Sequence, residues 1–210
     1  SADAPVSRLR VAVVMPPPSD LVPAAALDLS PTFTNSLVAL LSTGEIDPIG
    51  CCRTTGGAPM VRRQGIDYVF EPDDRQLARR VAAMRPDVVH VHGLGFTRLL
   101  VQIRRAVGGR VPILMQHHGE QPPSSARSLL AQRITRRFVA GYLFTGGAAQ
   151  AEPFRQAGVV NPSAPVYEVL ESASNLDDDQ IGDVPDLVGN PCILWVGRLI
   201  ASKDPLCAVQ

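Results

Sequence analysis

The sequence has almost no lysine and few aromatic side chains. Lys203 is the only lysine among 20 basic residues, and Phe, Trp and Tyr together make up 5% of the 210 residues. The 20 acidic residues balance the basic ones, so the chain as a whole has no field that would attract nucleic acid or an anionic membrane. Aromatic residues do not alternate with basic ones as they do in proteins that stack bases. We therefore expect no nucleic-acid partner, and binding at local sites only.

Long apolar runs are also absent. No stretch of 18 apolar residues could span a bilayer, and the N-terminal sequence SADAPVSRLR lacks the apolar centre of a secretory signal. The four cysteines, Cys51, Cys52, Cys192 and Cys207, do not have the spacing of a disulfide framework or a metal site, so we expect reduced thiols. These features predict a cytoplasmic protein, and they leave peripheral contact with the inner face of a membrane open.

Short apolar segments alternate with amphipathic ones along most of the chain. About seven strands and five helices are predicted over residues 9–170. The strands are expected at 9–15, 46–52, 67–70, 87–92, 111–116, 141–146 and 165–170, and the helices at 31–43, 72–86, 97–109, 124–141 and 148–158. In the helix at 124–141, Leu130, Ile134 and Phe138 are expected to face the core. This alternation is typical of a doubly wound, mostly parallel α/β sheet of the Rossmann-like kind.

The composition changes after residue 170. Residues 171–190 carry six acidic residues and no basic one, which indicates a linker. The segment PCILWVGRL then predicts a new strand, followed by the start of a helix. We expect one domain over residues 1–190, including the linker 171–190, and in residues 191–210 the first strand and part of a helix of a second, truncated domain.

Glycine is missing where a dinucleotide site would need it. The first glycine of the chain is Gly44, so the loop after the first strand cannot carry the glycine fingerprint of NAD or FAD binding. Gly93 and Gly95 do follow a strand, but Arg98 stands where the third glycine would be. There is also no Walker loop and no Gly-x-Ser-x-Gly elbow.

All four histidines lie at the ends of two predicted strands. His90 and His92 share one face of their strand because they are two residues apart, whereas His117 and His118 diverge unless the strand has already ended. They could be structural residues satisfied by backbone, or zinc ligands, although no third ligand follows His92 at a short spacing. They could also form a polar rim that binds a hydroxylated ligand, which we favour for His92 and His118. Glu120 is either a solvated loop residue or a carboxylate of this same rim.

Three segments, taken in order, resemble a known family. Asp87–His92, His118–Gly119, and Gly197–Leu199 followed by Lys203–Asp204 occupy the places of motifs found in the retaining glycosyltransferases of family 4, which have the two-domain GT-B fold. The resemblance implies transfer of a sugar from a nucleotide-sugar donor to a sugar, lipid or other glycan acceptor. Configuration would be retained, and neither a metal ion nor a cofactor would be needed. The donor-binding domain would be the second domain of the same protein.

The resemblance also implies roles for individual residues. Arg198 and Lys203 would bind the donor diphosphate and stabilise the charge on the leaving group, with Gly197 beside them. His118 would be the catalytic residue next to the transferred sugar. The acceptor side would be formed by His92, Gly93, Gly119 and Glu120.

The chain departs from the family at three places. The loop after the first strand lacks the usual Gly-Gly pair, residues 171–177 replace the usual Asn-Gly-x-Asp, and the paired glutamates of the donor domain are absent. We therefore expect the chain to be inactive alone. Two alternatives remain open, namely a nucleotide-sugar epimerase of GT-B fold and a non-catalytic module that binds a glycan, a lipid or a protein. The basic helix with Arg127, Arg133, Arg136 and Arg137 is either a solvated face or a contact for anionic lipid.

Overall fold

The computed structural model describes residues 8–15, 27, 31–54 and 60–169. They belong to the first of two units into which the chain divides, Ser1–Ser174 and Asn175–Gln210. The expected linker 171–190 and the expected second domain at 191–210 lie outside the described residues. So do Cys192 and Cys207, whereas Cys51 and Cys52 are buried free thiols. Burial raises the pKa of Cys52 to about 12.

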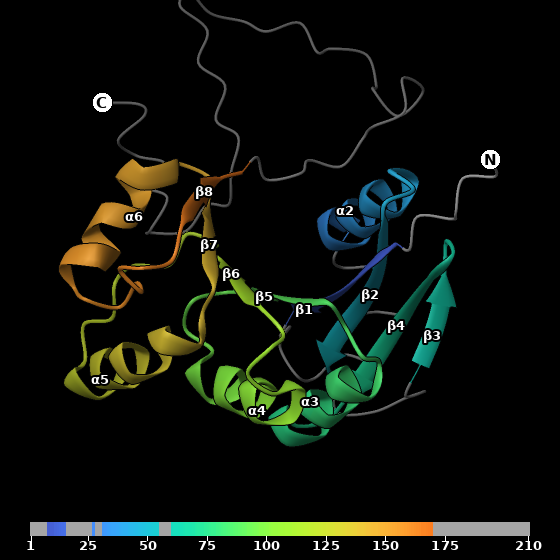
Figure 1. Cartoon of the computed structure of the whole chain (residues 1–210), viewed down its shortest axis with the longest axis horizontal. Helices are drawn as coiled ribbons and strands as arrows, with labels where there is room; N and C mark the ends of the chain where they lie inside the picture. The colour runs from blue at the N-terminus through green and yellow to red at the C-terminus, as the bar shows by residue number, and fades with distance from the viewer. Residues whose placement is uncertain (1–7, 16–26, 28–30, 55–59, 170–210) are drawn as a thin grey trace, which may run out of the picture. The chain divides into compact units, whose positions relative to one another are not determined.

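An eight-stranded sheet organises the described residues (Figure 1). Its strands are β1 Leu9–Met15, β2 Ile46–Arg53, β3 Met60–Arg63, β4 Ile66–Glu71, β5 Val88–His92, β6 Ile113–Gln116, β7 Gly141–Phe144 and β8 Val166–Glu168. The helices are α2 Pro31–Ser42, α3 Asp74–Ala83, α4 Thr97–Val107, α5 Ala126–Thr135 and α6 Gly147–Gln156, and a 3₁₀ turn η1 covers Arg136–Phe138. The predicted doubly wound, mostly parallel α/β fold is confirmed. None of the helices in these ranges is long and apolar enough to cross a membrane.

Local signals explain where several helices begin and end. The Asp73 side chain accepts hydrogen bonds from the main-chain N–H of Arg75 and Gln76, both at 2.9 Å, and so caps α3. Ser125 caps α5 in the same way through the Ser128 N–H at 3.2 Å. The chain leaves α2 at Gly44, whose φ of +76° suits glycine, as the sequence predicts.

One strand was missed in the sequence. The sequence predicts no strand between residues 52 and 67, but residues 60–63 form β3, which pairs antiparallel with β4. The two residues between the strands, Gln64 and Gly65, have φ of 51° and 80°. Positive φ at both positions is the geometry of a type I′ hairpin turn, whose twist matches that of the strands it joins. The remaining neighbours in the sheet are all parallel.

The sheet buries apolar side chains on both faces. Ala12, Val14, Val89 and Val91 point to one face and belong to the core cluster that includes residues of α3 and α4. Val11 and Val13 point to the other face and pack with residues of α2, including Leu37. Figure 1 shows α2 on one side of the sheet and α3 and α4 on the other. Burial on both faces explains why β1 is apolar at every position from Val11 to Val14.

The predicted orientation of the helix after β6 is wrong. Leu130 and Ile134 were expected in the core, but they are 60% and 50% exposed, and Phe138 is half-buried in η1. The helix itself ends at Thr135 rather than at Gly141. Thr135 is buried because its hydroxyl donates to the Ala131 carbonyl at 2.9 Å, which satisfies the polar group inside the protein.

The strand order places a topological switch in the middle of the sheet. The chain runs from β1 outward to β2 and β4, and then crosses to β5 on the other side of β1 before it continues to β6, β7 and β8. In open α/β sheets, ligands bind at the carboxyl ends of the strands that flank such a switch. The switch lies between β1 and β5, so the residues that follow β5 occupy the position where a ligand is expected, and those that follow its neighbour β6 lie at the same edge.

Candidate functional site

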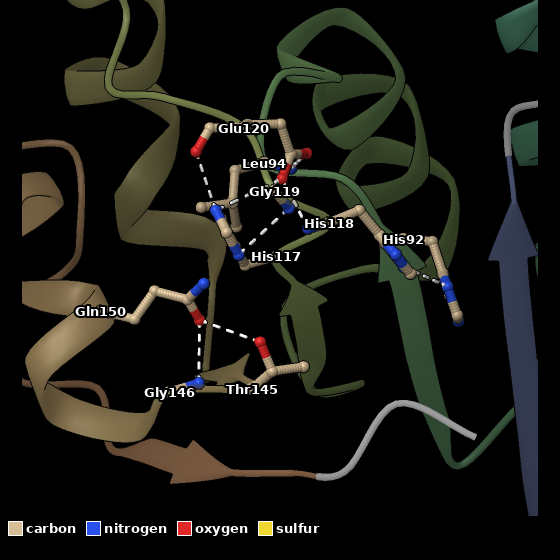
Figure 2. A network of polar contacts seen from close by, with 9 residues as sticks. All are labelled: His92, Leu94, His117, His118, Gly119, Glu120, Thr145, Gly146 and Gln150. Atoms are coloured by element: carbon tan, nitrogen blue, oxygen red, sulfur yellow. Dashed lines mark hydrogen bonds and ion pairs between the residues drawn. The ribbon is translucent and has the colours of Figure 1, made fainter. Parts of the chain in front are cut away.

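Two histidines from different strands meet at this edge of the sheet (Figure 2). His92 is the last residue of β5, and His118 lies two residues beyond the end of β6. Their rings are stacked with centroids 4.8 Å apart, and the Nδ1 of His92 lies 2.7 Å from the Nε2 of His118. In this hydrogen bond one nitrogen carries the hydrogen and the other accepts it. The structure thus brings together the two histidines that the sequence favoured as a polar rim.

A third imidazole extends the stack beneath them. The rings of His90 and His92 lie 4.5 Å apart on the same side of β5, as their spacing of two predicts. Phe33 of α2 packs its ring edge-on against His92 at 5.9 Å. The Nε2 atom of His90 is buried and has no hydrogen-bond partner within the described residues. The row of three rings therefore runs from His90, whose Nε2 is buried, to the exposed residue His118.

Burial keeps the two inner histidines neutral. It lowers the pKa of His90 to about 4, with a smaller contribution from the neighbouring His118 and an opposing one from a hydrogen bond to Gln116. Burial also lowers the pKa of His92 to about 2, and His90 and His118 lower it further. At neutral pH His90 and His92 are accordingly uncharged imidazoles, each with one donor and one acceptor nitrogen.

Glu120 joins the loops that follow the two strands. Its Oε1 accepts from the Leu94 N–H at 2.8 Å, and its Oε2 accepts from the His118 N–H at 2.5 Å. Charge-assisted bonds of this kind are stronger than bonds between neutral groups. Glu120 is therefore not a solvated loop residue, and it fixes the position of His118 relative to the loop after β5.

His117 points away from His118, into the protein. It is 3% exposed, and its ring stacks on Phe144 at 5.0 Å. Its Nε2 lies 2.8 Å from the Glu120 carbonyl, and its Nδ1 accepts from the Gly119 N–H at 3.3 Å. A carbonyl can only accept, so the hydrogen of His117 is on Nε2. His117 is thus a structural residue that holds the loop 117–120 against the core.

The position directly after β5 requires glycine, both because its φ is positive and because a Cβ there would clash with its neighbours. Gly93 has a φ of +98°, and a Cβ at this position would lie 2.5 Å from the Phe96 ring and 3.2 Å from Oε1 of Glu120. Its N–H donates to the Gln116 carbonyl at 2.8 Å, which ties the loop to the end of β6. Gly119 also has a positive φ, of +75°, but has open space around it. A side chain would therefore clash at position 93 but not at position 119.

A third loop at the same edge was missed in the sequence. Gly146 and Thr145 follow β7 and donate to the Oε1 of Gln150, at 2.9 Å through the main-chain N–H and at 3.2 Å through the hydroxyl. Figure 2 shows this group beside His117. Glu168 of β8 lies next to Gly147, since a Cβ on Gly147 would be 2.8 Å from a Glu168 carboxylate oxygen. The signal for this loop is a Thr-Gly-Gly sequence directly after a strand.

The structure places five of the predicted site residues together. His92, Gly93, His118, Gly119 and Glu120 form two adjacent loops at the carboxyl edge of the sheet. The residues predicted to bind the donor diphosphate, Gly197, Arg198 and Lys203, lie outside the described residues. In the described ranges, no group of three His, Cys, Asp or Glu side chains is arranged to hold a metal ion.

Comparisons with known proteins give limited information. No family model matches the chain, and none of the curated proteins matches it. Among solved structures, it is similar to a chain of a sucrose-phosphate synthase from Thermosynechococcus elongatus, with a TM-score of 0.47 and 9% identity. The alignment covers 79% of this chain and 90% of that one. The assignment of the fold rests on the strand order and strand directions described above.

Proposed function

We propose that residues 1–190 are the acceptor-binding domain of a retaining, metal-independent glycosyltransferase of the GT-B kind. The observation that carries the proposal is the pairing of His92 with His118 at the carboxyl end of β5 and β6, beside the switch point. The order of the sequence motifs supports it, because the strand that ends in His92, the His118–Gly119 end and the Gly197–Lys203 segment follow one another as in family 4.

The chemistry of the edge suits a ligand rich in hydroxyl groups. Sugar hydroxyls both donate and accept hydrogen bonds, as neutral imidazoles do, and one nitrogen of His92 and one of His118 are already bonded to each other. The inner histidines stay neutral because burial lowers their pKa, so they do not add a charge that would need a counter-ion. Neutral imidazoles at His90 and His92, beside the Glu120 carboxylate, favour a sugar over an anionic group as the ligand on this side.

His118 is the residue best placed to touch the transferred sugar. His92 binds its ring and Glu120 binds its main-chain N–H, while the residue as a whole is exposed at the edge. In the proposed reaction its ring stabilises the positive charge that develops on the sugar. Arg198 and Lys203 would stabilise the negative charge on the leaving diphosphate in place of a metal ion.

The test is turnover of nucleotide sugars by the protein of the complete gene. A panel of donors is incubated with glycan acceptors in the presence of EDTA, and the anomeric linkage of any product is determined by NMR. We expect transfer with retention, and a loss of roughly 100-fold or more in His118→Ala. Gln121→Ala, an exposed neighbour, should leave turnover unchanged, and thermal unfolding of both variants separates misfolding from loss of chemistry.

Other outcomes would decide for the alternatives. Conversion of the donor sugar with release of free nucleotide, without an acceptor product, would indicate the epimerase. Binding of a glycan without turnover of any donor would indicate a non-catalytic module. Near-normal turnover in either Arg198→Ala or Lys203→Ala would contradict the proposed binding of the donor diphosphate. We expect the 210-residue chain alone to be inactive.

A further inference from the structure

The outward side of α5 exposes two large apolar side chains. Leu130 and Ile134 are 60% and 50% exposed, and a spacing of four residues puts them side by side on the helix. The opposite side of α5 is fixed against the protein, because Thr135 is buried and Leu129 packs on the core. Figure 1 shows α5 at the periphery of the molecule, on the far side of the sheet from α2. The helix therefore presents these side chains without any need to fold on binding.

Arginines surround the two apolar side chains. Arg127 and Arg133 lie three residues before and three residues after Leu130, and Arg137 lies three residues after Ile134; all three are exposed. We call Arg127, Leu130, Arg133, Ile134 and Arg137 the α5 outer face. The sequence contains no Asp or Glu from residue 121 to residue 151.

Among the described residues, only neutral groups contact these arginines. The Nε of Arg133 donates to the Ala157 carbonyl at 2.9 Å, and the Arg137 guanidinium lies 5.0 Å from the centroid of the Phe138 ring. Within the described part of the chain, neither of them nor Arg127 forms an ion pair with a carboxylate. The α5 outer face thus has a small apolar centre surrounded by positive charges.

The size and charge of this face fit a lipid surface better than a protein. A stable protein interface buries about 800 Å² on each partner and has an apolar centre of several residues, whereas this face has two. A helix that lies in a membrane interface places an apolar strip at the acyl boundary and basic residues at the level of the phosphates. Each arginine near an anionic leaflet contributes about fivefold to binding.

We propose that the α5 outer face docks the protein on an anionic membrane. Leu130 and Ile134 enter the boundary of the acyl chains, and Arg127, Arg133 and Arg137 contact lipid phosphates. This inference is independent of the proposed function, since vesicle binding is measured without turnover. Because α5 begins six residues after Glu120, docking would hold the loop 117–120 near the membrane surface. An acceptor borne by a lipid would then be presented close to the site.

The test is cosedimentation of the 210-residue protein with vesicles of phosphatidylcholine, with and without phosphatidylglycerol. We expect reversible binding to the anionic vesicles at low salt, and loss of binding at high salt. The double variant Arg127→Glu/Arg137→Glu should bind roughly 30-fold or more weakly, because two contributions of about fivefold are lost. The double variant Leu130→Ser/Ile134→Ser should bind about tenfold more weakly. All four side chains are exposed, so both variants should fold.

Matched controls come from the other end of the sheet. Met60 of β3 is 58% exposed, and Arg75 and Arg79 are exposed on α3. Arg75→Glu/Arg79→Glu changes the charge by the same amount as the α5 double variant, and Met60→Ser replaces one exposed apolar side chain; we expect each to bind anionic vesicles within about threefold of wild type. Absence of vesicle binding, equal binding to neutral vesicles, or equal losses in the control variants would overturn the proposal. So would a dimer without lipid that Leu130→Ser/Ile134→Ser abolishes, because it would make this face a contact between copies.

Discussion

Replacing Glu120 by glutamine tests how the candidate site is held together. The change keeps the size of the side chain but removes its charge and one of its two acceptor oxygens. The N–H groups of Leu94 and His118 each donate to a different oxygen, so in Glu120→Gln one of them faces an amide NH₂ group. Leu94 is 6% exposed, which leaves little room for water to replace the lost bond. We therefore expect the loops after β5 and β6 to separate locally.

The expected loss of stability in Glu120→Gln follows from the two hydrogen bonds that Glu120 accepts. A hydrogen bond to a charged group contributes roughly 1.5–3 kcal/mol, and the side chain of Glu120 is 31% exposed, which favours the lower end of that range. We expect the free energy of unfolding to fall by about 2–3 kcal/mol, which is roughly 5–10 °C in melting temperature for a chain of this size. Urea unfolding and calorimetry measure both, and hydrogen exchange should show faster exchange at the Leu94 amide.

A matched control separates this effect from the loss of a negative charge. Glu45 is an exposed carboxylate outside the site, so Glu45→Gln should change the free energy of unfolding by less than about 0.5 kcal/mol. If Glu120→Gln cost no more than Glu45→Gln, and the Leu94 amide kept its protection, the bridge between the two loops would be refuted.

Three further predictions concern the same framework. Gly93→Ala should lower the free energy of unfolding by at least about 2 kcal/mol more than Gly119→Ala, because both have positive φ but only Gly93 lacks space for a Cβ; equal losses in denaturant unfolding would contradict this packing. The unfolded chain takes up protons at His90 and His92 near pH 6.5, whereas the folded chain does so only near pH 4 and pH 2. The free energy of unfolding is therefore highest above pH 6.5 and falls on acidification, by about 2 kcal/mol per histidine at pH 5. If the free energy of unfolding of His90→Gln depended on pH as steeply as that of the wild type, this would argue against burial of the His90 ring. Arg104 donates to the carbonyls of Gly108, Val111 and Phe138, so Arg104→Lys should destabilise by about 1–3 kcal/mol and the exposed Arg105→Lys by very little; similar melting temperatures in the two variants would show that these contacts add nothing.

The fold was predictable because the local signals agree with the tertiary structure. The apolar β1 is buried on both faces, Asp73 caps α3, and Gly44 terminates α2. β3 escaped prediction because its MVRR sequence has no alternating apolar pattern, and it forms through pairing with β4. Such pairing depends on a partner elsewhere in the chain, which local propensity does not report.

The side of α5 that faces the core could not be predicted from hydrophobic spacing either. Leu130 and Ile134 have the spacing of a core face, but the side of the helix that faces inward is fixed by polar contacts. Arg136 donates to the Gly158 carbonyl, and the Thr135 hydroxyl bonds within its own helix and can therefore be buried. These contacts pair residues whose partners cannot be identified from hydrophobic periodicity.

The candidate site was predictable in its location but not in its connections. His92 and His118 follow neighbouring strands, and the carboxyl ends of parallel strands meet at one edge, so their proximity follows from the fold. The two bonds of Glu120 and the inward turn of His117 depend on the conformation of the loop 117–120. The Thr145–Gln150 group went unrecognised because it lies outside the motifs of the resemblance.

The most direct test of the central claim is the product formed by the protein of the complete gene, with EDTA present, from a nucleotide sugar and a glycan acceptor. The account predicts a glycosidic bond with the anomeric configuration of the donor, formed without metal and reduced roughly 100-fold or more in His118→Ala while Gln121→Ala is unaffected. A product of inverted configuration, an absolute requirement for metal, or full activity in His118→Ala would contradict it.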